Sequence, residues 1–525
     1  MTFKGRSVGG VAAASLMVLA TGLAFGPAAS AQVDFGYNGC DGYSYPTYVA
    51  DGMIPPASAW GMMASPTFTN RDDKAIRHGR AGVEACDKAF ADLPRVEKHH
   101  PWPMRRAVLL RARAQHDLEA GDVTAALADL DQAETVARPF AGQQWFARSL
   151  GVNLALTRAV AFNMAGRQGE TEALIRQAVA ARPYDSLMQW SALAALGPKG
   201  DPALMLALLT QAARLDARAL PALILANLDA SRFDAVVTLY PQMAANGPNA
   251  DLEAADAAGA YAYALAVGGR GAEARAALAE AQARLPGQGG LLGGWARAVD
   301  LRLQLAAGMT PSQVRAALAT PSRTAADPDL LRALARAAPE MADQLNAAAD
   351  DIAAKRRARG QALDMATVFA MAPGAEAPSN RPPYSNAPMP IMGDKSPEVV
   401  SAAQGWRVTD KGGGVWTVRF RGHKASGGMI QELCMLRAAE LAREKGAKAL
   451  LIVARRDTDW TLTEYGAYNP AYGVTMPQGF ETEIDVLLVD PAAMPAGHAA
   501  EGWRTLDAAA VIAALEPLYH AGGRK

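Results

Sequence analysis

The spacing of apolar residues divides the chain into a long helical part and a short mixed part. From about residue 73 to 359, alanine and leucine recur at helical spacing between short breaks at Gly or Pro, a pattern that predicts a series of amphipathic helices. Further along, Val415 to Phe420 and Glu481 to Val489 are predicted strands, and Met429 to Lys445 is a predicted helix with one apolar face. We therefore expect a mainly α protein that ends in a small α+β domain.

Small residues recur at fixed offsets around three glycines of the helical part. An alanine lies seven residues before each glycine, and small or aliphatic residues follow five, nine and twelve positions after it, with Thr171 as the exception. Small side chains allow two antiparallel helices to approach closely, glycine forms the turn between them, and proline ends the second helix. The repeat-signature residues are Ala114, Gly121, Ala126, Ala133, Ala159, Gly166, Ala178, Pro183, Ala262, Gly269, Ala274, Ala281 and Pro286.

This repeat resembles the tetratricopeptide family, in which helical hairpins stack into a right-handed solenoid with a concave face that usually binds peptides. The spacing departs from the family: Gly121 and Gly166 are 45 residues apart and Gly166 and Gly269 are 103 apart, whereas the family repeat is about 34 residues long. A weaker copy has its turn at Ala230. The resemblance thus implies an irregular TPR-like α-solenoid.

Composition shifts mark the remaining boundaries. We expect a signal peptide at 1–31, an irregular leader rich in Gly, Pro and Tyr at 32–72, the helical repeats at 73–360, a Pro-rich linker at 361–398 and the α+β domain at 399–525. Within the last domain, Gly412–Gly414 is a predicted hairpin turn and Glu464 to Gly479 a predicted loop.

Part of the α+β domain resembles a known but uncharacterised group. The runs 417–422, 436–441 and 446–450 are similar to a small αβ domain of alphaproteobacterial envelope proteins and lipoproteins. This resemblance covers only about residues 405–490, and it implies residence in a bacterial envelope without assigning catalytic residues.

The N-terminus has the features of an export signal. Lys4 and Arg6 precede a small and apolar run, and an Ala-x-Ala site ends at Ala31, so we expect cleavage between Ala31 and Gln32. The mature chain is then periplasmic or secreted and has no transmembrane span. In such an oxidising compartment Cys40 and Cys86 are candidates for a disulfide, although two free thiols remain the alternative.

Charge and composition exclude several classes of function. Among 525 residues, 52 lysines and arginines balance 52 aspartates and glutamates, and 50% of the chain is hydrophobic. This balance argues against a nucleic-acid binder, and the loss of Lys4 and Arg6 on export makes the chain slightly acidic. The sequence contains no phosphate-binding or dinucleotide-binding motif, so no cofactor is expected.

Few residues suggest catalysis or metal binding. Asp457 and His423 follow two predicted strands and are a candidate acid and base pair, with solvated strand ends as the simpler interpretation. Cys434 is expected to be a core thiol. His99, His100 and His116 lie close together in the sequence, but adjacent histidines rarely point to one ion, so we expect no metal.

The sequence favours a non-catalytic protein that binds a protein or peptide partner of the cell envelope through the groove of its helical repeats. A cell-envelope hydrolase or transferase acting through the α+β domain is the alternative, and a structural spacer is a third.

Sequencing the N-terminus of the exported protein tests the expected cleavage. Release by signal peptidase should give a chain that begins at Gln32. A chain that still begins at Met1 would contradict the prediction.

Overall fold

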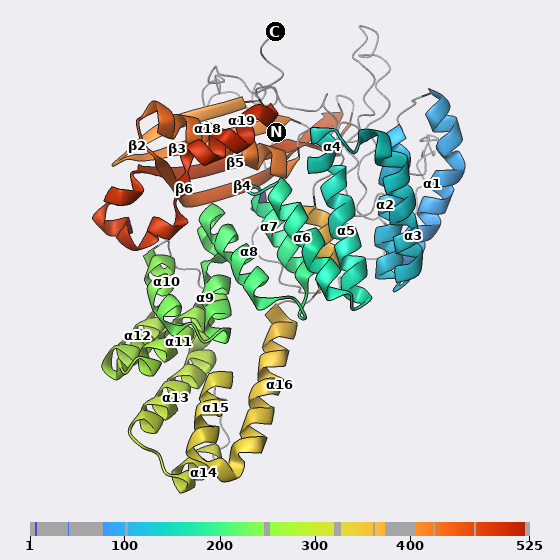
Figure 1. The fold of residues 1–525 in the computed structure, drawn as a ribbon. Coiled ribbons are helices and arrows are strands. Elements are labelled where there is room, and N and C mark those ends of the chain that lie inside the picture. The colour runs from blue at the N-terminus through green and yellow to red at the C-terminus, as the bar shows by residue number, and fades with distance from the viewer. Residues whose placement is uncertain are drawn as a thin grey trace.

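The computed structural model shows a largely helical chain with a C-terminal sheet (Figure 1). No helix in the part of the chain described below is long and apolar enough to cross a bilayer. The residues described are 6–7, 40, 77–99, 103–245, 252–319, 327–360, 363–372, 405–423, 426–466 and 469–519. The expected cleavage site between Ala31 and Gln32 lies outside them.

Pairs of consecutive helices pack against each other along the helical part. The three hairpins at the repeat glycines are α2 (Pro103–Glu119) with α3 (Val123–Ala137), α5 (Leu150–Met164) with α6 (Gln168–Ala181), and α11 (Leu252–Val267) with α12 (Gly271–Arg284). The other helices are α1 (Gly79–His99), α4 (Gln144–Arg148), α7 (Ser186–Leu196), α8 (Pro202–Leu215), α9 (Leu220–Asp229), α10 (Phe233–Ala245), α13 (Gly289–Ala306), α14 (Pro311–Ala319), α15 (Pro328–Ala337), α16 (Ala342–Gly360) and α17 (Met365–Met371).

The three repeat glycines form the same left-handed turn. Gly121, Gly166 and Gly269 have φ values of +83°, +73° and +76°, a conformation that glycine adopts at little cost. In each turn the backbone N–H of the residue after the glycine donates to the carbonyl four residues before the glycine, at 2.8 to 2.9 Å. A fourth turn of this kind, between α9 and α10, has Ser231 at φ +55°. The turn of the weaker copy therefore lies at Ser231, one residue after the expected Ala230.

The small residues of the repeat lie between the paired helices. The eight repeat alanines, Ala114, Ala126, Ala133, Ala159, Ala178, Ala262, Ala274 and Ala281, are all 0 or 1% exposed. Thr171 is also buried, and its hydroxyl donates to the carbonyls of Ala159 at 3.3 Å and Arg167 at 3.2 Å. The hydrogen bonds satisfy the buried hydroxyl, which explains how threonine occupies a position for a small residue. Pro183 and Pro286 follow the ends of α6 and α12.

The segment expected to be a linker, 361–398, begins with a docked helix. α17 packs on α5 and α7, Val368 and Phe369 are buried in the core of the first helices, and the Ser191 hydroxyl donates to the Val368 carbonyl at 3.1 Å. Residues 363–372 thus belong to the helical part, because two apolar side chains supply enough contact to order a short segment. Residues 373–398 lie outside the described part.

The C-terminal sheet is antiparallel, with the order β1-β4-β5-β3-β2 and with β6 beside β4. Its strands are β1 (Arg6–Ser7), β2 (Gly405–Gly412), β3 (Val415–His423), β4 (Ala449–Gly466), β5 (Asn469–Val489) and β6 (Leu506–Asp507). The β2–β3 hairpin turns at Gly412–Gly414, which all have positive φ, as the sequence predicts. The helices α18 (Gly427–Glu444) and α19 (Ala508–Tyr519) pack on the sheet (Figure 1).

The expected loop from Glu464 to Gly479 is instead part of a long hairpin. β4 and β5 remain paired as far as Gly466 and Asn469. Pro477 lies within the expected loop and pairs with Thr461 where the register shifts by one residue. A bulge of this kind tolerates proline within a ladder, so the Gly and Pro content did not end the strands.

Helix α18 is buried almost along its entire length between the sheet, α19 and α7. Cys434 lies at its centre with 0% exposure, and its Sγ is 3.5 Å from the Val418 carbonyl and 3.6 Å from the Thr482 carbonyl. Burial raises the pKa of this thiol far above its ordinary value. Cys434 is therefore a core thiol.

Two substitutions test the turn geometry. Gly121→Ala should lower the free energy of unfolding by about 1 kcal/mol, because a Cβ there meets no atom but strains a left-handed residue. Ser231→Gly should be neutral or stabilising for the same reason. Urea denaturation measures both, and equal destabilisation by the two changes would contradict the assigned turns.

Candidate functional site

The helical part and the sheet meet at a buried cluster of charges centred on Glu432 of α18. Its carboxylate is 0% exposed and forms ion pairs with Arg148 and Arg182 of the helical part, the second at 3.3 Å. The Tyr519 hydroxyl of α19 donates to the same oxygen at 2.7 Å. Arg182 also faces Asp185, at 3.7 Å between Nε and Oδ2. Two cations thus share two carboxylates away from water.

The two carboxylates of this cluster ionise differently. Burial raises the pKa of Glu432, but Arg182 and Arg148 outweigh it and leave the pKa below its usual range. Asp185 is equally buried, and its longer contact with Arg182 does not offset this, so burial raises its pKa to about 6. Glu432 is therefore the permanent anion that balances the two arginines.

Neighbouring contacts fix the same junction. The Gln431 side-chain oxygen accepts from the amide of Ser186 at 2.8 Å and from that of Leu187 at 3.4 Å, at the start of α7. A Cβ on Gly428 would lie 2.1 Å from Asp185 Oδ2, so this close approach of α18 requires glycine. Further along, the Trp503 indole donates to Gln242 of α10 at 3.0 Å. The two parts of the molecule are thus joined by specific polar contacts.

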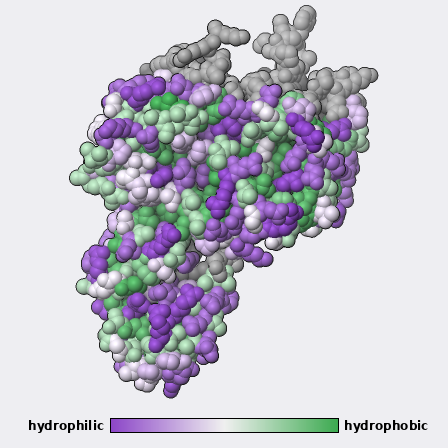
Figure 2. All heavy atoms as spheres, in the orientation of Figure 1, coloured by the Kyte–Doolittle hydropathy of each residue, from purple (hydrophilic) through white to green (hydrophobic). Residues whose placement is uncertain are grey.

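An open pocket of about 270 Å³ lies beside this junction. It is bounded by the loop after α8, by α9, α10, α11 and the end of α12, and by residues 453–455 of β4. Hydrophobic surface gathers where α9 and α10 approach the sheet (Figure 2). The lining residues are Asp216, Ala217, Arg218, Pro221, Tyr240, Met243, Ala244, Ala254, Arg284, Leu285, Val453, Ala454 and Arg455.

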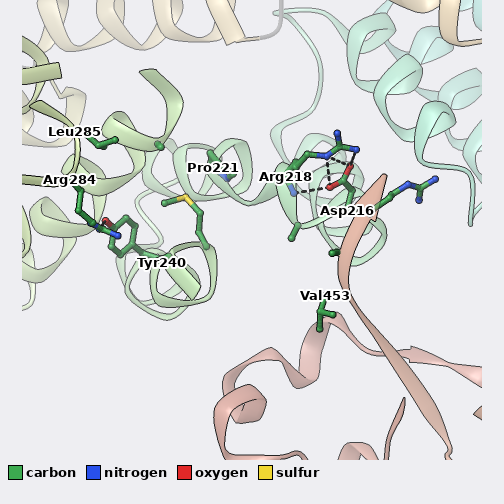
Figure 3. A pocket seen from close by; sticks show the side chains of 13 residues that line it. Asp216, Arg218, Pro221, Tyr240, Arg284, Leu285 and Val453 are labelled. Carbon is green, nitrogen blue, oxygen red and sulfur yellow. Dashed lines mark hydrogen bonds and ion pairs between the residues drawn. The ribbon is translucent and has the colours of Figure 1, made fainter. Parts of the chain in front are cut away.

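One wall of the pocket is an ion network that crosses from the helices to β4. Asp216 caps the 3₁₀ turn Ala217–Ala219 and binds the Arg218 guanidinium at 2.6 Å (Figure 3). On β4, Arg455 pairs with Asp457 at 2.7 Å and donates to the Leu215 carbonyl at 3.4 Å. Arg218 reaches Asp457 at 4.0 Å. The network holds Arg218 in place while its side chain stays 46% exposed.

The opposite wall is aromatic and basic. Tyr240 stacks on Tyr261 with 4.4 Å between ring centroids, and the Arg284 guanidinium donates to the Tyr240 hydroxyl at 2.9 Å. Figure 3 shows this pair on one side of the pocket and Asp216 with Arg218 on the other. The ion pair of Arg284 with Glu280 is 3.6 Å long, and the arginine side chain is 36% exposed. Two partly exposed guanidinium groups thus flank an apolar floor.

The candidate acid and base pair of the sequence analysis is not arranged as expected. Asp457 lies within β4, where it accepts from the Thr482 hydroxyl at 2.8 Å and pairs with Arg455. These contacts outweigh the effect of burial and lower the pKa of Asp457, which makes it a weak base. In the register of the sheet, Phe420 lies beside Thr482 and His423 lies three positions farther along β3.

The other sequence candidates belong to the first helices of the chain or precede them. Cys40 and Cys86 are joined in a disulfide, with Cα atoms 4.5 Å apart. His116 is buried in α2 and lies beside Glu119 and His78. The side chains of His99 and His100 lie outside the described residues. Of this group only His116 is a candidate from the sequence, although Glu119 follows it at the helical spacing of three.

Comparisons with protein-family models, with curated proteins and with solved structures find no match.

Glu432→Gln should destabilise the protein by about 3 to 5 kcal/mol, because it leaves two buried arginines without their shared anion. Glu444→Gln is the matched control on the same helix, since Glu444 is half exposed and pairs with Arg437; it should cost less than about 1 kcal/mol. Chemical denaturation compares them. Equal effects would contradict the role assigned to Glu432.

Asp185→Asn should change how stability depends on pH. The folded pKa of Asp185 is near 6, above the ordinary value of 3.8, so the folded state binds this proton more tightly than the unfolded state does. Proton binding by Asp185 therefore stabilises the folded state fully below about pH 4, and this stabilisation is lost as the pH rises through 6. Asparagine retains the cap on the Met188 amide. The variant should match the wild type at pH 4 and exceed it by about 2 kcal/mol at pH 7.5. A difference that does not vary with pH would contradict this.

Proposed function

We propose that this chain is an exported, non-catalytic interaction or scaffold protein of the bacterial periplasm that binds a peptide segment of a partner protein. In this proposal the paired helices form an irregular TPR-like solenoid, and the α+β domain closes one side of the binding site. The observation that carries the proposal is the pocket between the two parts, with exposed guanidinium groups on two walls and an apolar floor.

The chemistry of the pocket suits an acidic group next to an apolar side chain. Guanidinium groups bind carboxylates through paired hydrogen bonds, and both Arg218 and Arg284 are partly exposed. Pro221, Met243 and Val453 supply apolar surface between them. A volume of about 270 Å³ is small for a cofactor and suits one or two side chains. An acidic peptide, or a peptide C-terminus, meets these requirements.

The lining favours binding over catalysis. The described residues that line the pocket include no serine, threonine, cysteine or histidine, which are frequent nucleophiles and proton carriers. The hydroxyl of Tyr240, also in the lining, accepts from Arg284 at 2.9 Å. Asp216, the one carboxylate among them, is engaged by Arg218. The alternative of a hydrolase or transferase lacks support from Asp457 for the reasons given above.

Compartment and partner are supported by the sequence. The basic and apolar N-terminus with its Ala-x-Ala site favours export, and a disulfide between Cys40 and Cys86 is typical of an oxidising compartment. These observations support a partner in the cell envelope and argue against nucleic acid.

Site-specific photo-crosslinking in cells tests the proposal. A photoreactive residue in place of Met243, which lines the pocket, should crosslink to one defined envelope protein. The same residue in place of Ala276 on the exposed face of α12 should not. Recovery of the same proteins from both positions would contradict the proposal.

Removing the two arginines of the pocket tests whether they bind the partner. Arg218→Ala with Arg284→Ala should reduce the crosslink at position 243 at least about tenfold, because the charge-assisted hydrogen bonds are lost. Arg167→Ala, which removes an exposed arginine paired with Glu170 away from the pocket, should leave it unchanged. An undiminished crosslink in the double variant would exclude carboxylate recognition at this site.

A further inference from the structure

The last turn of α2 and the residue directly before α1 bring two imidazoles and a carboxylate together. The ligand atoms of His78, His116 and Glu119 all lie within 4.8 Å of one another. His116 Nδ1 is 3.1 Å from one oxygen of Glu119, and His78 Nδ1 is 3.3 Å from the other. The ring centroids of the two histidines are 6.0 Å apart. The group lies at the first two helices of the chain, and none of its residues belongs to the charge cluster around Glu432.

The hydrogen bonds of His116 determine which ring nitrogen carries a proton. Its Nε2 lies 2.8 Å from the Cys40 carbonyl, and because a carbonyl oxygen only accepts, Nε2 is the donor. In a neutral ring Nδ1 therefore presents a lone pair, yet it faces a carboxylate oxygen, which is also an acceptor. Either a second ring proton on Nδ1 or a metal ion between the two atoms resolves this conflict.

We propose that His78, His116 and Glu119 bind a Zn²⁺ ion. One cation placed between the two ring nitrogens and the carboxylate would contact all three ligands at once. Ligand atoms of a tetrahedral zinc are roughly 3.3 Å apart, given zinc to ligand distances near 2.0 Å. His116 Nδ1 lies 3.1 Å from one oxygen of Glu119 and His78 Nδ1 lies 3.3 Å from the other, so either carboxylate oxygen is close to this spacing from one of the two rings. Two histidines and one carboxylate leave the fourth position for a water on the exposed side of His78.

The hydrogen bond and the burial of His116 are those expected of a zinc ligand. Histidines that bind zinc usually donate their other ring nitrogen to a backbone carbonyl, as His116 does to Cys40. The ring is 0% exposed and lies against the backbone of α1, where a Cβ on Gly82 would be 2.4 Å from it. The disulfide from Cys40 to Cys86 fixes the carbonyl that orients the ring. A bound ion would therefore join His78, directly before α1, to the last turn of α2.

Zinc titration of the metal-stripped mature chain tests this proposal. With a chromophoric chelator as competitor, the protein should bind one Zn²⁺ per chain at micromolar or lower Kd, and the ion should raise Tm. His78→Ala and Glu119→Gln should each weaken binding roughly 100-fold or more, at least the loss seen when a supporting partner is removed. Because His78 is half exposed, its variant should fold, as circular dichroism would verify.

Two control variants separate this site from other histidines. His498 pairs with Glu501 at 2.8 Å with the same spacing of three but belongs to no described three-ligand group, so His498→Ala should leave zinc binding unchanged. The double variant His99→Ala with His100→Ala should also bind normally. Absence of stoichiometric binding, unchanged binding in His78→Ala, or loss of binding in the His99 and His100 variant would each overturn the proposed ligand set.

Discussion

The pairing of Glu432 with Arg148 and Arg182 is the constraint on which the arrangement of the molecule depends. α18 is the helix on which the sheet packs, and its one fully buried anion is neutralised by arginines from the helical part. An uncompensated buried charge is far more costly than a surface one. The α+β domain therefore has one favourable position on the helices, and the pocket between β4 and the loop after α8 exists because that position is fixed.

Local sequence patterns predicted the parts of the fold that local physics determines. Gly121, Gly166 and Gly269 were recognisable because a left-handed turn selects glycine, and the repeat alanines because closely packed helices exclude larger side chains. Ser231 escaped the pattern because a serine can hold the same turn at some cost in strain. The long β4–β5 hairpin was missed because Pro477 lies at a bulge, where it does not interrupt the strand.

The candidate site could not be predicted in this way, because its partners are distant in the sequence. Arg182 and Glu432 are 250 residues apart, and no local sequence pattern at either position predicts that they pair. The sequence predicts that Asp457 follows the end of a strand, whereas it lies inside the longer strand β4 beside the buried Arg455. In the sequence, the histidines near His116 are His99 and His100. In the fold, His78, directly before α1, lies beside His116 instead.

The distance distribution between the two parts of the molecule tests the role of Glu432 most directly. Spin labels on cysteines placed at the exposed positions Ala276 in α12 and Ala509 in α19 measure it by pulsed electron resonance, and Cys434 is too buried to be labelled. A junction fixed by this carboxylate predicts one narrow distribution in the wild type and a broad one in Glu432→Gln. Equally narrow distributions in both proteins would contradict it.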